Sequence, residues 1–481
     1  MMLDGNGPLH AQLIRTLKAN ILQGRFAAGS RLPPTRWLAS ELGVSRNTVL
    51  TAYEQLQAEG FVDGRVGSGS YVTPPLLASG VDPQPPDRVG AQSRYAARMR
   101  EVFDYRRIPG RTVPDMRFSF QYGVPLTNPM LTTAWARALS QAANYTRPHY
   151  PPVQGLPELR EAICDYLARR RGIQAMPEDV VIVSGTQQAL ALAMRVLLDP
   201  GEAAVIEEPH YFAIRRALLI HGARVLPVPV DGEGLRCDAL SKPAPKLVCV
   251  TPSHQFPSGA VMSLPRRMAL LDYANRHGSW IFEDDYDGEF RYDSRPLAAL
   301  RSLDTQGRVI YVGTFSKALF PALRMGYLVV PPALRRDFVS AKWVEDFGSP
   351  TIEQAALANF MRDGGFERHL RRTAKALKER RAALIEGLRE CSRGRLEIAD
   401  SRAGMHLVVW LRGRTQAECE ALIALARSRG LGLYPITPFY EEPPDRAGLL
   451  MGYGGLSVLE IRQAMAVFGA CLDELVPLRS A

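Results

Sequence analysis

The fold is decided by the stretch YVGTFSKALFPALRMGYLVV, residues 311–330. Two apolar runs, each long enough for a buried strand, flank a turn that holds a single lysine, Lys317, and ends near Arg324. Continuous apolar runs of this kind are typical of mainly parallel sheets that carry helices on both faces. Because the end of a buried strand is an unfavourable place for an idle amine, the stretch predicts both an α/β fold and a functional lysine.

Further apolar runs alternate with helical patterns before this stretch. They are DVVIVSG (179–185), EAAVIEEP (202–209), KLVCVTPS (246–253) and SWIFEDDYD (279–287). Ligands of open α/β sheets bind at the carboxyl ends of the strands, and polar side chains collect after these runs. The body of the chain is therefore predicted to carry its site at that edge of the sheet.

The composition limits the class of protein. A chain of 481 residues exceeds one ordinary core, so two or three domains are expected. No run reaches the roughly 18–20 apolar residues of a membrane helix, and the start lacks a signal sequence, which predicts a cytoplasmic protein without membrane partners. Six cysteines without paired spacing predict neither a disulfide framework nor a metal site. The net charge of +10 favours an anionic partner.

The first 75 residues follow the pattern of a winged helix-turn-helix. Three helices are predicted over residues 8–24, 35–42 and 45–60, with Thr35 capping the second and Ser45 the third. A glycine-containing turn at Gly43 separates the last two helices, and FVDGRVGSGSYVT (61–73) reads as a hairpin, the wing.

This order places candidate DNA contacts at the start of the third helix. Arg46, Asn47, Thr48 and Thr51 can face base edges or phosphates in a major groove, and Arg31, Arg36 and Arg65 can flank them on the DNA backbone. Residues 1–75 hold seven Arg/Lys against five Asp/Glu, a net charge of only +2, so the prediction depends on where the arginines lie. The alternative is a three-helix subdomain with solvated arginines.

Residues 30–62, SRLPPTRWLASELGVSRNTVLTAYEQLQAEGFV, resemble the winged helix of GntR-type bacterial regulators. The resemblance implies contacts to operator DNA from Arg36, Arg46, Thr51 and Gly67, with the capping Ser45 at the same helix start. Residues 76–115 are predicted to be a linker, whose arginines are expected to form a solvated basic face, with contacts to DNA or to the body as the alternative. The body then covers residues 116–481.

The strand ends of the body offer the groups that pyridoxal 5'-phosphate (PLP) requires. Lys317 is the Schiff-base candidate, Asp284 the carboxylate for the pyridine nitrogen, Tyr211 the stacking ring, and Tyr286 a donor to the phenolic oxygen. His254, or its neighbour Gln255, can bond a ring oxygen. The phosphate candidates are the helix start at Gly185, Thr186 and Gln187, together with Thr314, Ser316 and Arg324. A metal site competes for the carboxylates, but no histidine cluster accompanies them.

From residue 116 onward the chain resembles a fold-type I aminotransferase, on HYPPVQGLPELREAICDYL (149–167), EDDYDGEF (283–290) and GTFSKALFPALRMGY (313–327). A GntR-type head joined to such a body resembles the MocR subfamily of transcription regulators, including its PdxR group. The resemblance implies PLP bound at Lys317 and a domain-swapped homodimer with sites between the subunits.

Two positions depart from the enzyme pattern. Leu450, in AGLLMGYGGLS (447–457), stands where such aminotransferases place the arginine that binds the substrate carboxylate, and Ala213 replaces a second arginine found in the GABA-responsive regulator. We therefore expect a regulator without efficient turnover, with PLP itself favoured as the signal in control of vitamin B6 metabolism. The alternatives are a regulator of another amine, such as GABA or taurine, a working aminotransferase with a DNA-binding head, and a DNA-binding protein whose body is a scaffold.

Overall fold

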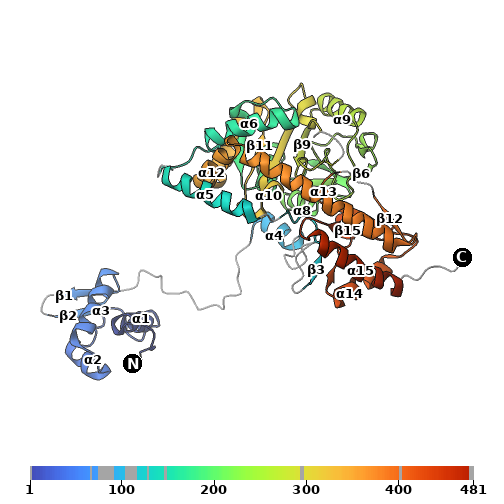
Figure 1. Cartoon of the computed structure of the whole chain (residues 1–481). Helices are drawn as coiled ribbons and strands as arrows, with labels where there is room; N and C mark the ends of the chain where they lie inside the picture. The colour runs from blue at the N-terminus through green and yellow to red at the C-terminus, as the bar shows by residue number, and fades with distance from the viewer. Residues whose placement is uncertain are drawn as a thin grey trace. The chain divides into compact units, whose positions relative to one another are not determined.

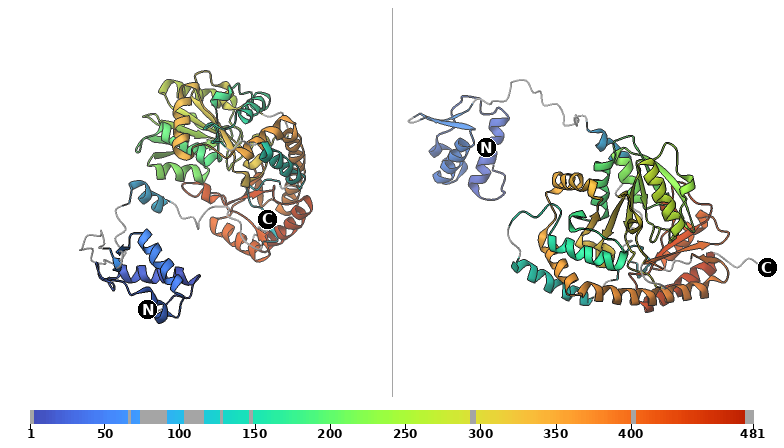
Figure 2. Two further views of the ribbon diagram at one scale, coloured as in Figure 1. Left: turned by 90° about the vertical axis from the view of Figure 1, so that its left-hand side faces the viewer. Right: turned by 90° about the horizontal axis from the view of Figure 1, so that it is seen from above.

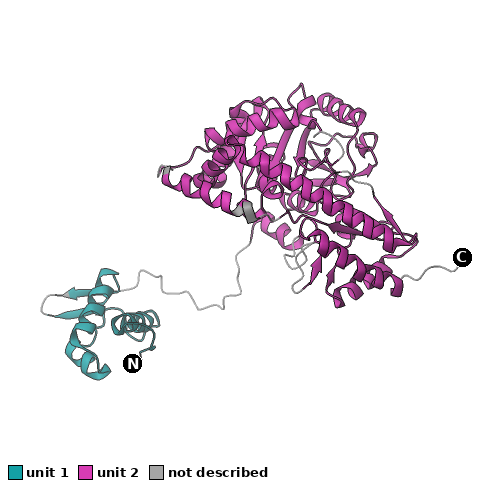
Figure 3. Cartoon of the chain, viewed as in Figure 1, with its two compact units in different colours: residues 1–91 teal, residues 92–481 magenta. Residues whose placement is uncertain are grey.

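The structure is a computed structural model that describes residues 3–65, 68–73, 92–102, 116–126, 129–145, 149–292, 297–399 and 403–475. The chain divides into two compact units, residues 1–91 and residues 92–481 (Figure 3). Each unit has a hydrophobic core of its own.

The first unit is a winged helix. Its helices are α1 (Leu9–Leu22), α2 (Thr35–Leu42) and α3 (Arg46–Ala58), and its hairpin pairs β1 (Val62–Arg65) with β2 (Gly69–Val72) in antiparallel register. The three predicted helices and the hairpin are confirmed. Leu13, Leu17, Val49 and Leu56 have no exposed surface and form the centre of its core, because the apolar positions of α1 and α3 recur at helical spacing.

Capping explains where the helices of the first unit, called the head below, begin. The Ser45 side chain accepts a hydrogen bond from the Thr48 backbone N–H at 3.1 Å, so the prediction of Ser45 as N-cap of α3 is confirmed. The prediction for Thr35 is wrong: Pro34 is the N-cap of α2, and no side chain caps this end. Proline supplies a fixed φ before the first turn without needing a donor.

The second unit is built on an eight-stranded, mostly parallel sheet with strand order β4-β11-β10-β9-β8-β5-β6-β7 (Figure 1). Its strands are β4 (Val180–Val183), β5 (Ala203–Glu208), β6 (Arg224–Asp231), β7 (Gly234–Leu235), β8 (Leu247–Val250), β9 (Trp280–Asp285), β10 (Val309–Thr314) and β11 (Gly326–Val329). Only β11 and β7 run antiparallel to their neighbours. Every predicted apolar run is a strand of this sheet, and the predicted α/β fold class is confirmed.

Strand β6 was missed by the sequence analysis. It pairs in parallel with β5 from Arg224 to Pro229, but it contains Pro227 and Pro229. Proline cannot donate to a strand ladder and is usually excluded from central strands, so the pattern does not read as a strand. Here only the two-residue β7 lies on the other side of β6, and few ladder hydrogen bonds are lost.

Helices cover both faces of this sheet (Figure 2). In β4, Val180 and Ile182 belong to one apolar cluster, whereas Val181 and Val183 belong to another, as side chains that alternate across a strand require. The helices of this part are α5 (Pro129–Tyr145), α6 (Pro157–Arg171), α7 (Thr186–Leu197), α8 (Phe212–His221), α9 (Leu264–His277), α10 (Phe315–Ala318), α11 (Arg335–Asp346) and α12 (Thr351–Arg362). None of the described helices is both long and apolar enough to cross a membrane.

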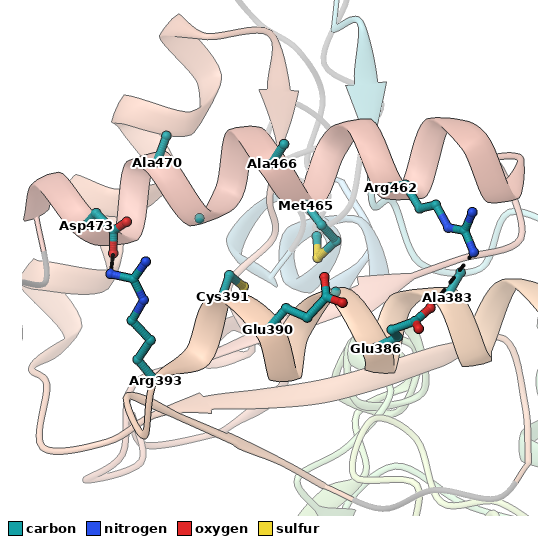
Figure 4. Close-up of a pocket in the computed structure, with 12 residues that line it drawn as sticks. Ala383, Glu386, Glu390, Cys391, Arg393, Arg462, Met465, Ala466, Ala470 and Asp473 are labelled. Atoms are coloured by element: carbon teal, nitrogen blue, oxygen red, sulfur yellow. Dashed lines mark ion pairs between the residues drawn. The ribbon is translucent and has the colours of Figure 1, made fainter.

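The C-terminal part adds a small antiparallel sheet with long helices. Its elements are α13 (Gly365–Ser392), β12 (Leu396–Ile398), β13 (His406–Leu411), α14 (Gln416–Ser428), β14 (Leu431–Gly432), β15 (Gly448–Gly452) and α15 (Val458–Leu475), with β14 paired to β3 (Phe118–Ser119). Helices α13 and α15 run side by side and approach closely at Gly387, where a Cβ atom would lie 2.5 Å from Met465 Cγ. A groove of about 620 Å³ follows this contact, with Arg393 paired to Asp473 at one end (Figure 4).

Part of the predicted linker is a helix that packs on the body. Helix α4 (Arg94–Val102) lies against α8, and Arg98 donates to the carbonyl oxygens of Ile220 and His221 at 2.8 and 2.9 Å. These carbonyls belong to the last turn of α8, which lacks intrahelical donors. Arg98 therefore belongs to the contact with the body, in place of the solvated face favoured by the sequence.

Candidate functional site

A cavity of about 280 Å³ at the carboxyl ends of the central strands gathers most of the predicted cofactor residues. Nine of them line it: Thr186, Gln187, Tyr211, Asp284, Tyr286, Thr314, Ser316, Lys317 and Arg324. The larger groove between α13 and α15 contains none of them. The cavity, and not the larger groove, is therefore the candidate site.

Lys317 enters the cavity from α10, the single turn that follows β10. Its Nζ donates a hydrogen bond to the Gly123 carbonyl oxygen at 2.6 Å. Burial lowers the pKa of Lys317, whereas the nearby carboxylates of Asp287 and Asp284 act in the opposite direction. A lowered pKa increases the fraction of neutral amine, which is the form that attacks a carbonyl.

Asp284 stands at the end of β9 and is 5% exposed. Burial, followed by the charges of Asp285 and Asp287, raises the pKa of Asp284 to about 7, while a hydrogen bond from Thr186 lowers it. Its Oδ1 is buried and has no hydrogen-bond partner in the described part of the chain. A buried carboxylate oxygen without a partner is costly, so the site is incomplete until a donor meets it.

The groups predicted to hold a phosphate lie together. Helix α7 begins at Thr186, directly after Gly185. Gly185 has a φ of +112°, a value that glycine adopts readily and other residues rarely do, and a Cβ atom at Gly185 would lie 3.4 Å from the Arg324 guanidinium. Arg324 itself has a φ of +47°, an unfavourable value for a non-glycine residue, and lines the cavity. The free N–H groups of the helix start and this guanidinium form an anion-binding arrangement. Gly185 contributes backbone shape and does not line the cavity itself.

His254 does not line the cavity and lies behind its wall. Its Nδ1 is 2.8 Å from Asp287 Oδ2 and 3.0 Å from the Tyr286 hydroxyl, and the residue is 2% exposed. The neighbouring Gln255 is also buried and donates to the Pro209 carbonyl at 2.8 Å. Phe256 lines the cavity instead. The predicted contact of His254 with a ring oxygen is therefore replaced by a supporting position beneath Tyr286.

Sequence reasoning missed several lining residues, namely Tyr122, Gly123, Phe212, Thr251, Phe256, Pro321, Met405 and His406. Tyr122 and Gly123 lie about 190 residues before Lys317, and Met405 and His406 about 90 residues after it. No motif connects these segments. Phe212 and Phe256 could have been predicted from the sequence, because Phe212 follows Tyr211 and Phe256 lies two residues after His254.

Neither of the two positions that depart from the enzyme pattern lines the cavity. Leu450 is fully buried on β15, opposite Val408 of β13, in one apolar cluster with Phe256, Ile436 and Phe439. Ala213 is not among the lining residues. Lys317, Arg324 and His406 are the basic side chains among the described residues that line the cavity. Burial lowers the pKa of His406 to about 4, so His406 is neutral at pH 7.

The candidate DNA contacts lie on the head. Arg46, Asn47 and Thr51 are exposed on α3, and Thr48 is half-buried because its backbone and hydroxyl bond Ser45. Arg31 and Arg36 are also exposed. Gly67 and the side chain of Arg65 lie outside the described residues. The exposed start of α3 is therefore free to enter a groove.

Comparison with known proteins agrees with both units. Residues 9–72 match the family of bacterial regulatory proteins called the gntR family, and residues 120–447 match aminotransferase class I and II. The chain is similar to the probable rhizopine catabolism regulatory protein MocR of Rhizobium meliloti, with 39% identity over 96% of this chain and 93% of that protein. It is also similar to the pyridoxine biosynthesis regulator PdxR of Corynebacterium glutamicum, with 30% identity over 95% and 94% of the two chains.

Solved structures show the same body. Pyrococcus horikoshii kynurenine aminotransferase, in a complex with PMP, has a TM-score of 0.69 at 27% identity over 81% of this chain and 96% of that one. LysN from Thermus thermophilus, complexed with a phosphopyridoxyl-leucine, has a TM-score of 0.69 at 27% identity, over 80% and 98% of the two chains.

The residues of this chain fit PLP, the cofactor of the class I and II aminotransferase domain. The unpartnered Asp284 Oδ1 suits a protonated pyridine nitrogen, Lys317 suits the aldehyde, and the start of α7 with Arg324 suits the phosphate. A DNA-reading head matched by one family model and a PLP-binding body matched by another occur together in one chain. The chain therefore belongs to the MocR subfamily of GntR-type transcription regulators.

Proposed function

We propose that this protein binds operator DNA through α3 and senses a small ligand in the cavity around Lys317. The observation that carries the proposal is the cavity itself, in which a half-buried lysine and an unpartnered buried carboxylate meet an anion-binding helix start. A body kept only as a scaffold would have no use for this combination, because each of these groups costs stability when it is buried.

When bound, the cofactor supplies an aldehyde that reacts with amines and a ring that withdraws electrons. In our proposal Lys317 holds the aldehyde carbon, Asp284 keeps a proton on the pyridine nitrogen, and Tyr211 stacks on the ring. Tyr286 donates to the phenolic oxygen and is held in place by His254 and Asp287. In the same proposal Thr186, Gln187, Thr314, Ser316 and Arg324 hold the phosphate, and Gly185 gives the turn before them its shape.

Efficient transamination is not part of the proposal. An aminotransferase orients its substrate for proton transfer through a carboxylate-binding arginine, and the buried Leu450 cannot do this. Misplacement of a substrate by about 1 Å can cost on the order of 100-fold in rate. The site is therefore suited to holding and exchanging an amine without turning it over.

The identity of the signal stays a prediction. PLP itself as the signal, in control of vitamin B6 metabolism, is supported by similarity to a regulator named for pyridoxine biosynthesis. Another relative is named for rhizopine catabolism, and the transcriptional regulator TauR of Rhodobacter capsulatus is 32% identical. We propose that the protein acts as a cytoplasmic homodimer, since two heads on two half-sites bind DNA more tightly than one.

Binding to operator fragments tests the proposal. Arg46→Ala should weaken binding to the specific fragment more than to random DNA, whereas Arg15→Ala, which removes an equal charge from α1, should weaken both alike. Adding PLP should change operator affinity in the parent protein and leave it unchanged in Lys317→Ala. Equal behaviour of Arg46→Ala and the parent would refute the recognition helix, and a parent insensitive to both PLP and amines would refute the sensor.

A further inference from the structure

Beside the cofactor residues the cavity is lined by aromatic and apolar side chains, and one of them, Phe256, also belongs to a buried cluster whose members Leu450 and Phe439 do not line the cavity. Leu450, Phe256 and Phe439 belong to one buried cluster, and Tyr122 packs against it with ring centroids 5.3 Å from Phe439 and 5.8 Å from Phe256. The contact with Phe439 is edge-to-face, at 83° between the ring planes. These contacts fix the plane of the Tyr122 ring.

Tyr122 precedes the residue that binds the reactive amine. The next residue, Gly123, accepts the hydrogen bond of Lys317 Nζ through its carbonyl oxygen at 2.6 Å. Both residues line the cavity. A molecule that reacts at Lys317 therefore occupies a cavity that Tyr122 also lines.

Two of the lining residues hold a buried side-chain polar atom without a hydrogen-bond partner in the described chain, Asp284 Oδ1 and Tyr122 Oη. Asp284 has a use in the proposed function, because it meets the pyridine nitrogen. Tyr122 has none. A buried hydroxyl without a partner costs about 1–3 kcal/mol, so a ligand that offers it a partner gains affinity.

The cavity wall at Tyr122 and Phe256 disfavours a charged ligand group. Among the described lining residues, Lys317 and Arg324 are assigned to the cofactor, and His406 is neutral at pH 7. A carboxylate placed against Tyr122 and Phe256 would lose its hydration without gaining a counter-charge. An uncharged group that bonds to a hydroxyl has no such penalty.

We propose that Tyr122 determines specificity for a primary amine whose far end is uncharged and carries a hydroxyl group. This inference rests on the proposed function, since the amine must exchange with Lys317. In the exchange the incoming nitrogen forms the C=N bond and the bond from that carbon to Lys317 breaks. Lys317 takes up the protons that the incoming ammonium releases, and no oxidant or reductant is consumed.

Three amines of similar length test the inference on the PLP-loaded protein: 4-aminobutan-1-ol, pentan-1-amine and 4-aminobutanoate. The half-saturating concentration of each is measured from the change in absorbance of the bound cofactor. The parent should favour the amino alcohol over both others by about 5- to 10-fold, the effect of one buried hydrogen bond. Tyr122→Phe should remove the preference for the amino alcohol over pentan-1-amine, and Leu450→Arg should lower the value for 4-aminobutanoate by about 10-fold or more.

Borohydride labelling of Lys317 is measured first in every variant. This control separates a failure of the proposed amine specificity from a failure of cofactor attachment. A parent that carries the cofactor but favours 4-aminobutanoate, or reacts with none of the three amines, overturns the inference and leaves cofactor attachment standing. An unchanged preference in Tyr122→Phe overturns it as well. A parent that binds no cofactor at Lys317 overturns both the inference and the proposed function.

Discussion

At the scale of single residues, burial acts on the two central groups of the cavity in opposite ways. It favours the neutral form of each, so the pKa of Lys317 falls while the pKa of Asp284 rises to about 7. A neutral lysine is ready to attack an aldehyde. At neutral pH the Asp284 carboxyl group is partly protonated, and it becomes fully charged when a protonated pyridine nitrogen pairs with it.

Lys317→Ala should abolish covalent labelling of the protein by PLP and borohydride, because Lys317 is the lysine that lines the described cavity. The fold should persist, since the side chain of Lys317 forms one hydrogen bond to Gly123 and is only half-buried. Peptide mapping of the reduced protein is the measurement. A label on another lysine of the parent would show that the site is wrongly assigned.

Asp284→Asn should stabilise the cofactor-free protein at pH 8 by about 1 to 4 kcal/mol, the size expected for a pKa raised by a few units. The folded parent binds more protons than the unfolded chain between about pH 4 and 7, so Asp284 lowers the free energy of unfolding as pH rises through this range. The difference between variant and parent, measured by urea unfolding, should therefore vanish near pH 4.

The same variant should bind PLP more weakly, because an amide cannot pair with a protonated pyridine nitrogen as a carboxylate does.

The pH dependence of the stability of the parent alone does not isolate Asp284, since burial also raises the pKa values of Glu207, Glu283 and Glu289 to about 7. If Asp284→Asn is less stable than the parent at pH 8, the unpartnered Asp284 carboxylate does not destabilise the cofactor-free protein.

At the scale of elements, α8 connects the cavity to the segment that leads from the head. Its N-cap is Tyr211, which lines the cavity, and its last turn is held by Arg98 of α4. The helix ends at Gly222, where φ is +103° and a Cβ atom would lie 3.0 Å from the Arg98 guanidinium carbon. Glycine at this position lets the arginine reach the carbonyl oxygens.

Arg98→Ala should release α4 from the body, since two hydrogen bonds from a charged donor are lost. Hydrogen exchange of the α4 amides should accelerate by about 10-fold or more. Arg100→Ala, an equal change at an exposed position of the same helix, should leave exchange and cofactor absorbance as in the parent. Unaltered protection of α4 in Arg98→Ala would mean that packing, and not this arginine, holds the helix.

At the scale of the whole molecule, the body exposes a group of large apolar side chains. Tyr150, Trp343, Val344, Phe347 and Ile352 are exposed, Val344 to 73%. The ring of Phe347 lies 5.6 Å from that of Tyr150 and 5.0 Å from that of Trp343, so these three rings form a connected patch. Exposed apolar patches of this kind mark association surfaces, and we assign this one to the proposed homodimer.

Val344→Glu should convert the dimer to monomers, because it buries a charge in the centre of an apolar contact. Light scattering after gel filtration measures the mass. Leu459→Glu, the same kind of change at an exposed leucine of α15, should leave the mass unchanged. A Val344→Glu protein that stays dimeric would place the interface elsewhere. The monomer should also bind an operator with two half-sites more weakly and with a smaller salt dependence.

The sequence by itself determined the elements and the chemistry that each carries. The apolar runs, the cap at Ser45 and the lysine after β10 are local features, because side-chain periodicity and turn chemistry depend on neighbours in the chain. For the same reason the sequence does not predict β6, because Pro227 and Pro229 are usually excluded from central strands. The prolines are tolerated here because β6 has only the two-residue β7 on its other side.

Only the tertiary structure decided which residues meet. Tyr122 and His406 lie far from Lys317 in the chain and reach the cavity because separate segments close over the same edge of the sheet. His254 and Phe256 differ by two positions, yet one supports Tyr286 from behind and the other forms the wall. Arg98, in a segment that reads as linker, holds the end of α8. Such contacts depend on packing across long separations in sequence, which no local pattern encodes.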